Sequence, residues 1–161
     1  MDDFSYSVIR SFNQYLNTNY ATASGEQLVL NPYPGQVNIK GSDTVSVHFY
    51  DRRITEIGGG RQVSGSEARF GEFWCKVDCW SPPNSAGEPR NGANRKLVDK
   101  VEKVLKPKVR INLLAWNGTG GTTVAGGMYV RQTGAAWLPV EDMEGYTRWQ
   151  LDYKIRAVDT D

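Results

Sequence analysis

The first hydrophobic pattern in the chain has the period of an α-helix. Its apolar residues recur every three or four positions and fall on one stripe of a helical surface: Phe4, Val8, Phe12, Tyr15 and Leu16. Asp2 or Asp3 is placed to cap this helix, because its side-chain oxygen can accept a hydrogen bond from a free backbone N–H. The polar segment 17–24 predicts where the helix ends.

Six segments have the composition or the alternation of β-strands. They are Gln27–Leu30, Thr44–Ile57, Arg69–Trp80, Val109–Trp116, Met128–Thr133 and Arg148–Ala157. The last segment alternates apolar and polar residues throughout, which predicts a sheet with one buried and one hydrated face. Stretches rich in glycine and proline predict a turn at 31–35, a flexible connection at 58–66 and loops at 81–92, 117–127 and 135–145.

A second helix is predicted between the third and fourth strands. Asn94 is expected to be its N-cap. The apolar stripe that follows consists of Leu97, Val101, Val104 and Leu105. Pro107 is expected to end the helix, because the residue before a proline is disfavoured in helical conformation.

The predicted order of elements is therefore α, β, β, β, α, β, β, β. Two amphipathic helices can cover one face of a mainly antiparallel or mixed sheet, so we expect an α+β fold in the form of a two-layer sandwich. A chain of 161 residues suits one domain, 1–161, since two domains of half that size would each hold a small core.

The charge of the chain is balanced, with 19 Lys and Arg against 18 Asp and Glu. A general nucleic-acid binder normally has a clear basic excess, so the balanced charge argues against one. Sequence-specific recognition of nucleic acid is not expected either. No apolar run approaches the roughly 20 residues that span a bilayer, and the acidic N-terminus lacks the apolar stretch of a signal peptide. We therefore expect synthesis in the cytoplasm and no membrane association.

Candidates for catalysis or ligand binding are few. Cys75 and Cys79 would lie roughly 13 Å apart in a strand, beyond the ~7 Å reach of a disulfide. They are expected to be small buried residues, and with His48 as the single histidine a metal site is not expected. The glycine-rich segment 118–127 lacks the lysine of a P-loop. We predict no catalytic residue, no metal, no cofactor and hence no enzyme.

The polar face of the strand Arg69–Trp80 is the most informative feature for function. It carries two indoles among charged side chains: Glu72, Trp74, Lys76, Asp78 and Trp80. A hydrated sheet face seldom holds large indoles, so these residues indicate either a protein–protein contact or a cover formed by the loop 81–92 of the same subunit. Arg52, Arg53 and Arg61 form a small basic group nearby, for which a salt-bridged surface is the favoured interpretation. The eight residues together are the candidate interface with other protein subunits.

In the order of its elements the chain resembles the tail terminator (tail completion) proteins of long-tailed bacteriophages, the group that includes the lambda tail terminator. The resemblance rests on the N-terminal amphipathic helix, the aromatic-rich strand Phe73–Trp80, the short helix Asn94–Leu105 and the final alternating strand Tyr146–Val158. It covers about residues 4–158.

The resemblance implies a structural protein of the virion tail or neck without catalytic residues or cofactors. Such proteins form a hexameric ring on the head-proximal end of the tail tube, end tube polymerisation and join the tail to the head. The implied partners are further copies of the chain, the tail tube protein, the head–tail connector or neck protein, and the tape-measure protein or sheath.

Two alternatives stay open. One is a head-closure or connector protein of the phage neck. The other is a small-ligand-binding α+β domain in which Trp74, Trp80, Trp116 or Trp137 would line a pocket.

Overall fold

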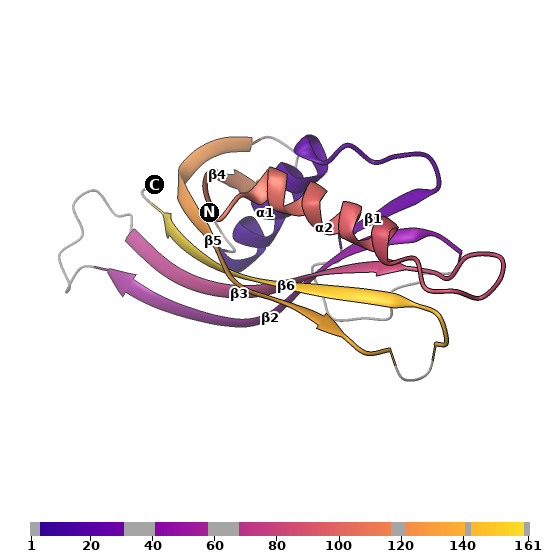
Figure 1. Cartoon of the computed structure of the whole chain (residues 1–161). Helices are drawn as coiled ribbons and strands as arrows, with labels where there is room; N and C mark the ends of the chain where they lie inside the picture. Colours follow the sequence, from indigo (N-terminus) through magenta and orange to yellow (C-terminus); the bar gives the residue numbers. More distant parts are fainter. Residues whose placement is uncertain (1–3, 31–40, 58–67, 117–121, 141–142, 160–161) are drawn as a thin grey trace.

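The computed structural model describes residues 4–30, 41–57, 68–116, 122–140 and 143–159. Its helices and strands are, in chain order, α1 (Phe4–Asn19), β1 (Glu26–Leu30), β2 (Asp43–Ile57), β3 (Ala68–Ser81), α2 (Asn91–Leu105), β4 (Lys108–Trp116), β5 (Thr122–Leu138) and β6 (Thr147–Asp159) (Figure 1). The predicted order of elements is confirmed. The predicted cap by Asp2 or Asp3, the turn at 31–35 and the connection at 58–66 lie outside the described residues.

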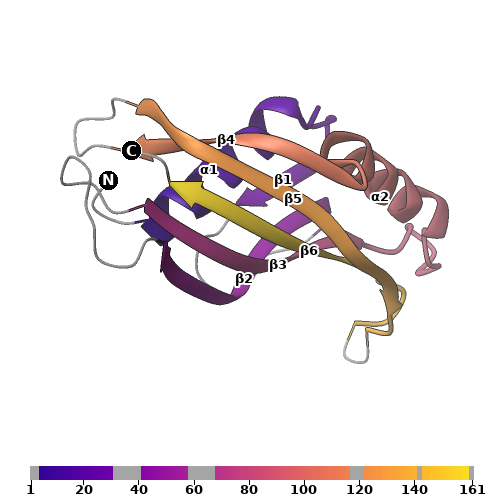
Figure 2. The same ribbon diagram turned by 90° about the vertical axis from the view of Figure 1, so that its left-hand side faces the viewer.

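The strands of the described part form one mixed sheet in the order β1-β2-β3-β6-β5-β4, in which β1 and β2 are parallel and the other pairs are antiparallel. The sheet curls, and both helices lie along its concave side (Figure 1). Figure 2 looks onto the other side, where β4, β5, β6, β3 and β2 follow one another with the helices behind them. The predicted α+β class with a mixed sheet and two helices is confirmed, whereas the curl departs from two flat layers.

The core lies between the helices and the concave face of the sheet. The strands contribute alternate residues, as the sequence predicts, and the helices contribute their apolar stripes: Val45, Val47, Phe49, Phe73, Cys75, Val77, Cys79, Leu151, Tyr153, Ile155, Val8, Phe12, Leu16, Leu97, Val98, Val101 and Leu105. Cys75 and Cys79 are free and fully buried, as expected. Burial raises the pKa of both thiols, so they stay protonated and act as small apolar side chains.

The prediction for β5 was wrong. The sequence predicted a short strand at Met128–Thr133 between two loops, but β5 runs for 17 residues, Thr122–Leu138. One of its glycines, Gly126, is required by close packing against β6. A Cβ atom on Gly126 would lie 1.9 Å from the carbonyl oxygen of Val158, so only glycine fits there.

The prediction for Asn94 was also wrong. α2 begins at Asn91, and its N-cap residue Arg90 makes no side-chain capping bond. Asn94 lies in the first turn and is fully buried. Its Nδ2 donates hydrogen bonds to the carbonyl oxygens of Cys79 (2.8 Å) and Thr147 (3.3 Å) and to Ser81 Oγ (3.2 Å). Asn94 therefore ties α2 to the adjoining ends of β3 and β6, which a cap on the helix alone would not do.

Candidate interaction surface

The predicted interface residues of β3 share the face of the sheet turned away from the helices, which we call the outer face. Glu72, Trp74, Lys76, Asp78 and Trp80 alternate with the buried residues of β3, so the pleat points them outward. Antiparallel pairing sets them beside residues of β6, namely Arg156, Lys154, Asp152, Gln150 and Arg148. The immediate surroundings of the predicted residues are thus supplied by a strand about 75 residues further along the chain.

The two indoles of β3 are partly buried and lie under cations of the same subunit. The Lys154 Nζ lies 5.2 Å from the ring centroid of Trp74, and the guanidinium carbon of Arg148 lies 4.5 Å from the ring centroid of Trp80. A cation over an indole at such distances contributes about 0.5–2 kcal/mol, depending on its exposure. Cations of β6 therefore lie over both indoles. The sequence had suggested two other covers, a partner protein or the loop 81–92, and neither suggestion included β6.

The two acidic residues that β3 contributes to this face are also occupied inside the subunit. Asp78 Oδ1 accepts hydrogen bonds from Arg148 Nε (3.2 Å), Arg148 Nη2 (3.1 Å) and Gln150 Nε2 (3.0 Å), and Asp78 is buried. Glu72 forms ion pairs with Lys154 and, at 3.6 Å, with Arg156 Nε. The hydrogen bond from Lys154 holds the pKa of Glu72 below its ordinary value, so this carboxylate stays charged.

Arg52 and Arg53 of the predicted arginine group lie on opposite faces of β2. Arg52 lies on the helix side of β2, and its Nη1 donates a hydrogen bond to Ser5 Oγ in α1 at 2.6 Å. Arg53 is exposed on the outer face, where it pairs in register with Glu72. Arg61 lies outside the described residues. Consecutive residues of a strand point to opposite faces, which separates Arg52 from Arg53.

Lys76 lies beside the most exposed aromatic ring of β2. Its Nζ is 4.9 Å from the ring centroid of Tyr50, a side chain that is 47% exposed. Tyr50 sits at a β-bulge between Phe49 and Asp51, where the register of β2 against β3 shifts by one residue. From this bulge onward residues 50–55 of β2 are all exposed.

Two strand edges of the sheet have no described neighbour. β1 pairs only with Asp43–Val47, so no described strand lies beside residues 50–55 of β2. β4 pairs with β5 only as far as Arg131, which leaves residues 133–138 of β5 without a described strand on that side. We call these segments the β2 edge and the β5 edge. They lie on opposite margins and at opposite ends of the sheet, because the β2 edge is in register with residues 70–74 of β3 and the β5 edge with residues 148–152 of β6.

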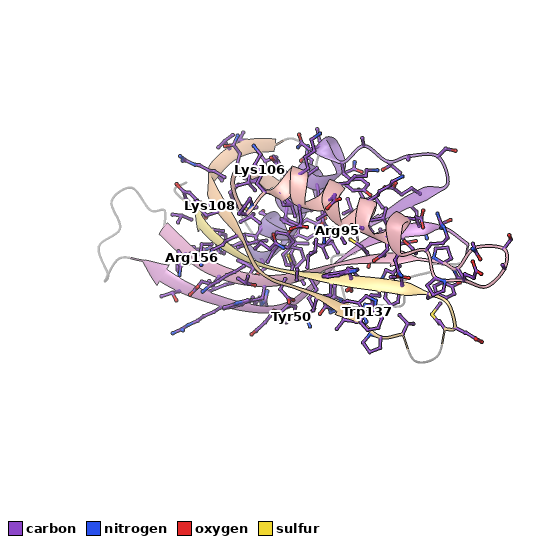
Figure 3. All side chains as sticks on the ribbon, viewed as in Figure 1. Tyr50, Arg95, Lys106, Lys108, Trp137 and Arg156 are labelled. Carbon is purple, nitrogen blue, oxygen red and sulfur yellow. The ribbon has the colours of Figure 1, made fainter. Side chains whose placement is uncertain are left out.

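Exposed apolar side chains are found at both edges. Tyr50 (47%) and Ile54 (43%) lie on the β2 edge, and Trp137 (56%) lies on the β5 edge. Figure 3 shows Tyr50 and Trp137 projecting from the sheet. Unpaired backbone N–H and C=O groups beside exposed apolar side chains favour the addition of another strand. Sequence reasoning missed this feature at Trp137, because the glycines and alanines around it predicted a loop.

A hollow of about 380 Å³ lies where the C-terminal ends of α1 and α2 meet, lined by Tyr15, Asn19, Tyr20, Ala21, Lys100, Lys103, Val104 and Lys106. Lys100 Nζ lies 2.9 Å from both carboxylate oxygens of Glu26, which also accepts a hydrogen bond from the Tyr20 hydroxyl. No tryptophan lines this hollow, so it is not the tryptophan-walled pocket of the ligand-binding alternative. The side chain of Trp116 lies outside that part.

Groups suited to metal binding do not cluster in the described segments, where no three His, Cys, Asp or Glu side chains converge. His48 is partly buried opposite Lys76 on the outer face. In the same segments no helix is both long and apolar enough to span a membrane. No protein-family model matches the sequence, and a search of curated proteins finds no match.

Proposed function

We propose that this chain is a structural assembly protein of a tailed bacteriophage. It forms a ring on the head-proximal end of the tail tube, ends tube polymerisation and joins the tail to the head. The order of elements that resembles tail terminators supports the viral role. The two unpaired edges on opposite margins of the sheet are the observation that supports self-assembly.

The edges provide a physical route to a ring. The β5 edge of one subunit pairs with the β2 edge of the next, so that one sheet continues into its neighbour. Each edge offers about six residues, which is the usual length of a strand in a sheet. Because the two edges differ, the contact is heterologous and leaves one edge of each kind free at the ends of an open chain of subunits. The chain of subunits closes into a ring if the rotation from one subunit to the next is a whole fraction of a full turn.

Capping follows from the same asymmetry. A ring that binds the last ring of the tube on one side, but presents a different surface on the other, blocks the addition of further tube subunits. The proposal includes six copies per ring, the tail tube and connector proteins as partners, and a location in the virion after synthesis in the host cytoplasm. It also includes the finer two-layer arrangement, in which α1 and α2 form one layer and the curled sheet the other.

Sedimentation velocity of the purified chain tests self-assembly. We expect a closed oligomer whose sedimentation coefficient does not rise further with concentration. Trp137→Lys, which places a charge on the β5 edge, is expected to reduce that species, whereas Val124→Lys, at an exposed residue in the part of β5 that pairs with β4, is the matched control. A chain that stays monomeric at all concentrations would contradict the proposal. So would an oligomer whose amount does not fall when the β5 edge is altered.

A small-ligand-binding domain is the second candidate, and the hollow at the ends of α1 and α2 favours it. Three lysines line this hollow together with two tyrosines, a composition that suits a small anion. Calorimetric titration with phosphates and carboxylates tests this candidate. Saturable binding that Lys103→Gln abolishes would support it, and heats of dilution alone would reject it.

A further inference from the structure

The curled sheet gathers positive charge that is dispersed along the sequence. Six cations of the outer face lie on four strands near one end of the sheet, with β3 between two of them: Arg53 of β2, Lys154 and Arg156 of β6, Arg131 of β5, and Lys108 and Arg110 of β4. We call this group the basic strip. Two of its members, Lys108 and Arg156, project at the same end of the molecule in Figure 3.

The register of the strands places the strip in two adjacent rows. In the first row Arg53, Glu72, Arg156, Tyr129 and Arg110 stand side by side on β2, β3, β6, β5 and β4. In the second row Asp51, Trp74, Lys154, Arg131 and Lys108 stand in the same order. Neighbouring strands lie about 4.8 Å apart and rows about 7 Å apart, so the strip spans roughly 19 Å across five strands.

The strip carries more positive charge than its acidic neighbours can neutralise. Glu72 and Asp51 are the carboxylates of these two rows, and Glu72 is engaged with Lys154 and Arg156. Arg131 and Lys108 are exposed and form no ion pair with another described residue. The near balance of 19 basic and 18 acidic residues in the whole chain therefore conceals a local excess on this surface.

We infer that the basic strip binds the phosphate backbone of double-stranded nucleic acid without reading its sequence. Four of the six cations are arginines, whose planar guanidinium groups bind phosphate oxygens in pairs. A single strand is the weaker fit, because it needs exposed rings on which bases stack. Of the two rings in these rows, Trp74 lies under Lys154 and Tyr129 is 57% exposed beside the Arg110 guanidinium, so the rows offer one exposed ring and not the series that stacking of successive bases needs.

The number of cations sets the expected salt dependence. If about four of them contact phosphates, the logarithm of the association constant falls with the logarithm of salt concentration at a slope of about −3.6. Affinity for a duplex then drops about 150-fold between 50 and 200 mM salt. The affinity is expected to be the same for unrelated duplexes of equal length.

Fluorescence anisotropy with two unrelated 24-base-pair DNA duplexes tests the inference on the whole chain. The test variant is K108Q/R110Q/R131Q, and the control R10Q/R95Q/K96Q removes the same charge from exposed positions on α1 and α2, outside both the basic strip and the hollow. Circular dichroism and thermal unfolding establish that both variants are folded. We expect the test variant to bind at least tenfold more weakly, with the salt slope reduced in magnitude by about 3, and the control to bind like the parent chain.

Three results would overturn the inference: no binding of either duplex at 50 mM salt, equal loss in both variants, or equally tight binding of poly-L-glutamate with the same dependence on the strip. The last result would identify the strip as a dock for acidic proteins. Ring formation by K108Q/R110Q/R131Q is measured separately by sedimentation, so the inference and the proposed function fail or hold independently.

Discussion

A mixing experiment provides a sharp test of the contact between unlike edges. Trp137→Lys alters the β5 edge, and Ile54→Lys alters the β2 edge. Lysine at a strand edge opposes the addition of another strand, because pairing would desolvate its ammonium group. Each variant keeps the other edge intact, so the two proteins together retain one complete contact.

The size of the effect follows from the exposed area of the indole. Trp137 is 56% exposed, and with roughly 200 Å² for a whole indole side chain about 110 Å² is left to be buried by a neighbour. At about 25 cal/mol per Å² this area is worth about 2.8 kcal/mol, or roughly 100-fold in association. Ile54, 43% exposed, is worth about 1 kcal/mol before the cost of the new charge.

Sedimentation velocity provides the assay. Each variant alone is expected to be monomeric at concentrations where the parent chain forms its closed oligomer. An equimolar mixture is expected to form a dimer and nothing larger, since the intact β5 edge of one protein pairs with the intact β2 edge of the other. A mixture that stays monomeric, or single variants that assemble like the parent chain, would refute the reasoning.

Three further predictions concern the fold. Asn94→Leu removes three hydrogen bonds from the start of α2 and is expected to lower the free energy of unfolding by about 2–4 kcal/mol in urea denaturation, whereas exposed Lys96→Ala changes it by less than about 0.5. Gly126→Ala forces β5 away from Val158 and is expected to cost more than about 3 kcal/mol in the same assay, while exposed Gly92→Ala, with no atom within 4 Å of the added methyl group, does not destabilise. The pKa of Glu72 is lower in the folded state than in the unfolded state, where it is about 4.3. The ionised carboxylate therefore stabilises the fold above about pH 4.3, and this stability is lost as the pH falls through the folded-state pKa. Glu72→Gln is expected to make the melting temperature fall less steeply between about pH 5 and pH 3. A fall unchanged by this substitution would show that Glu72 does not contribute.

Much of the fold could be predicted because β3 and β6 alternate strictly, β2 alternates as far as its bulge, and each helix carries a continuous apolar stripe. β5 could not, because glycine and alanine normally indicate a loop. The reason for Gly126 is the carbonyl group of Val158, which lies 32 residues further along the chain. The prediction for Asn94 failed for a similar reason, since its hydrogen-bond partners lie on the strands β3 and β6 and not on its own helix.

The candidate surface could be predicted only in part. The pattern of β3 identified the outward residues, but the cations that cover Trp74 and Trp80 come from β6. The basic strip and the two edges arise from strand order and from how far each strand extends beside its neighbour. Arg53, Lys108, Arg131 and Arg156 share no motif in the sequence, and the pairing of their strands makes them neighbours.

Polymerisation of the tail tube protein from the same virus, followed by negative-stain electron microscopy, tests the central claim most directly. The chain added during assembly is expected to appear as a ring on one end of each tube and to stop that end from growing when more tube protein is supplied. The Trp137→Lys variant is expected to leave tube growth unchanged. Tubes that keep growing from both ends in the presence of the parent chain, with no ring at either, would contradict the account.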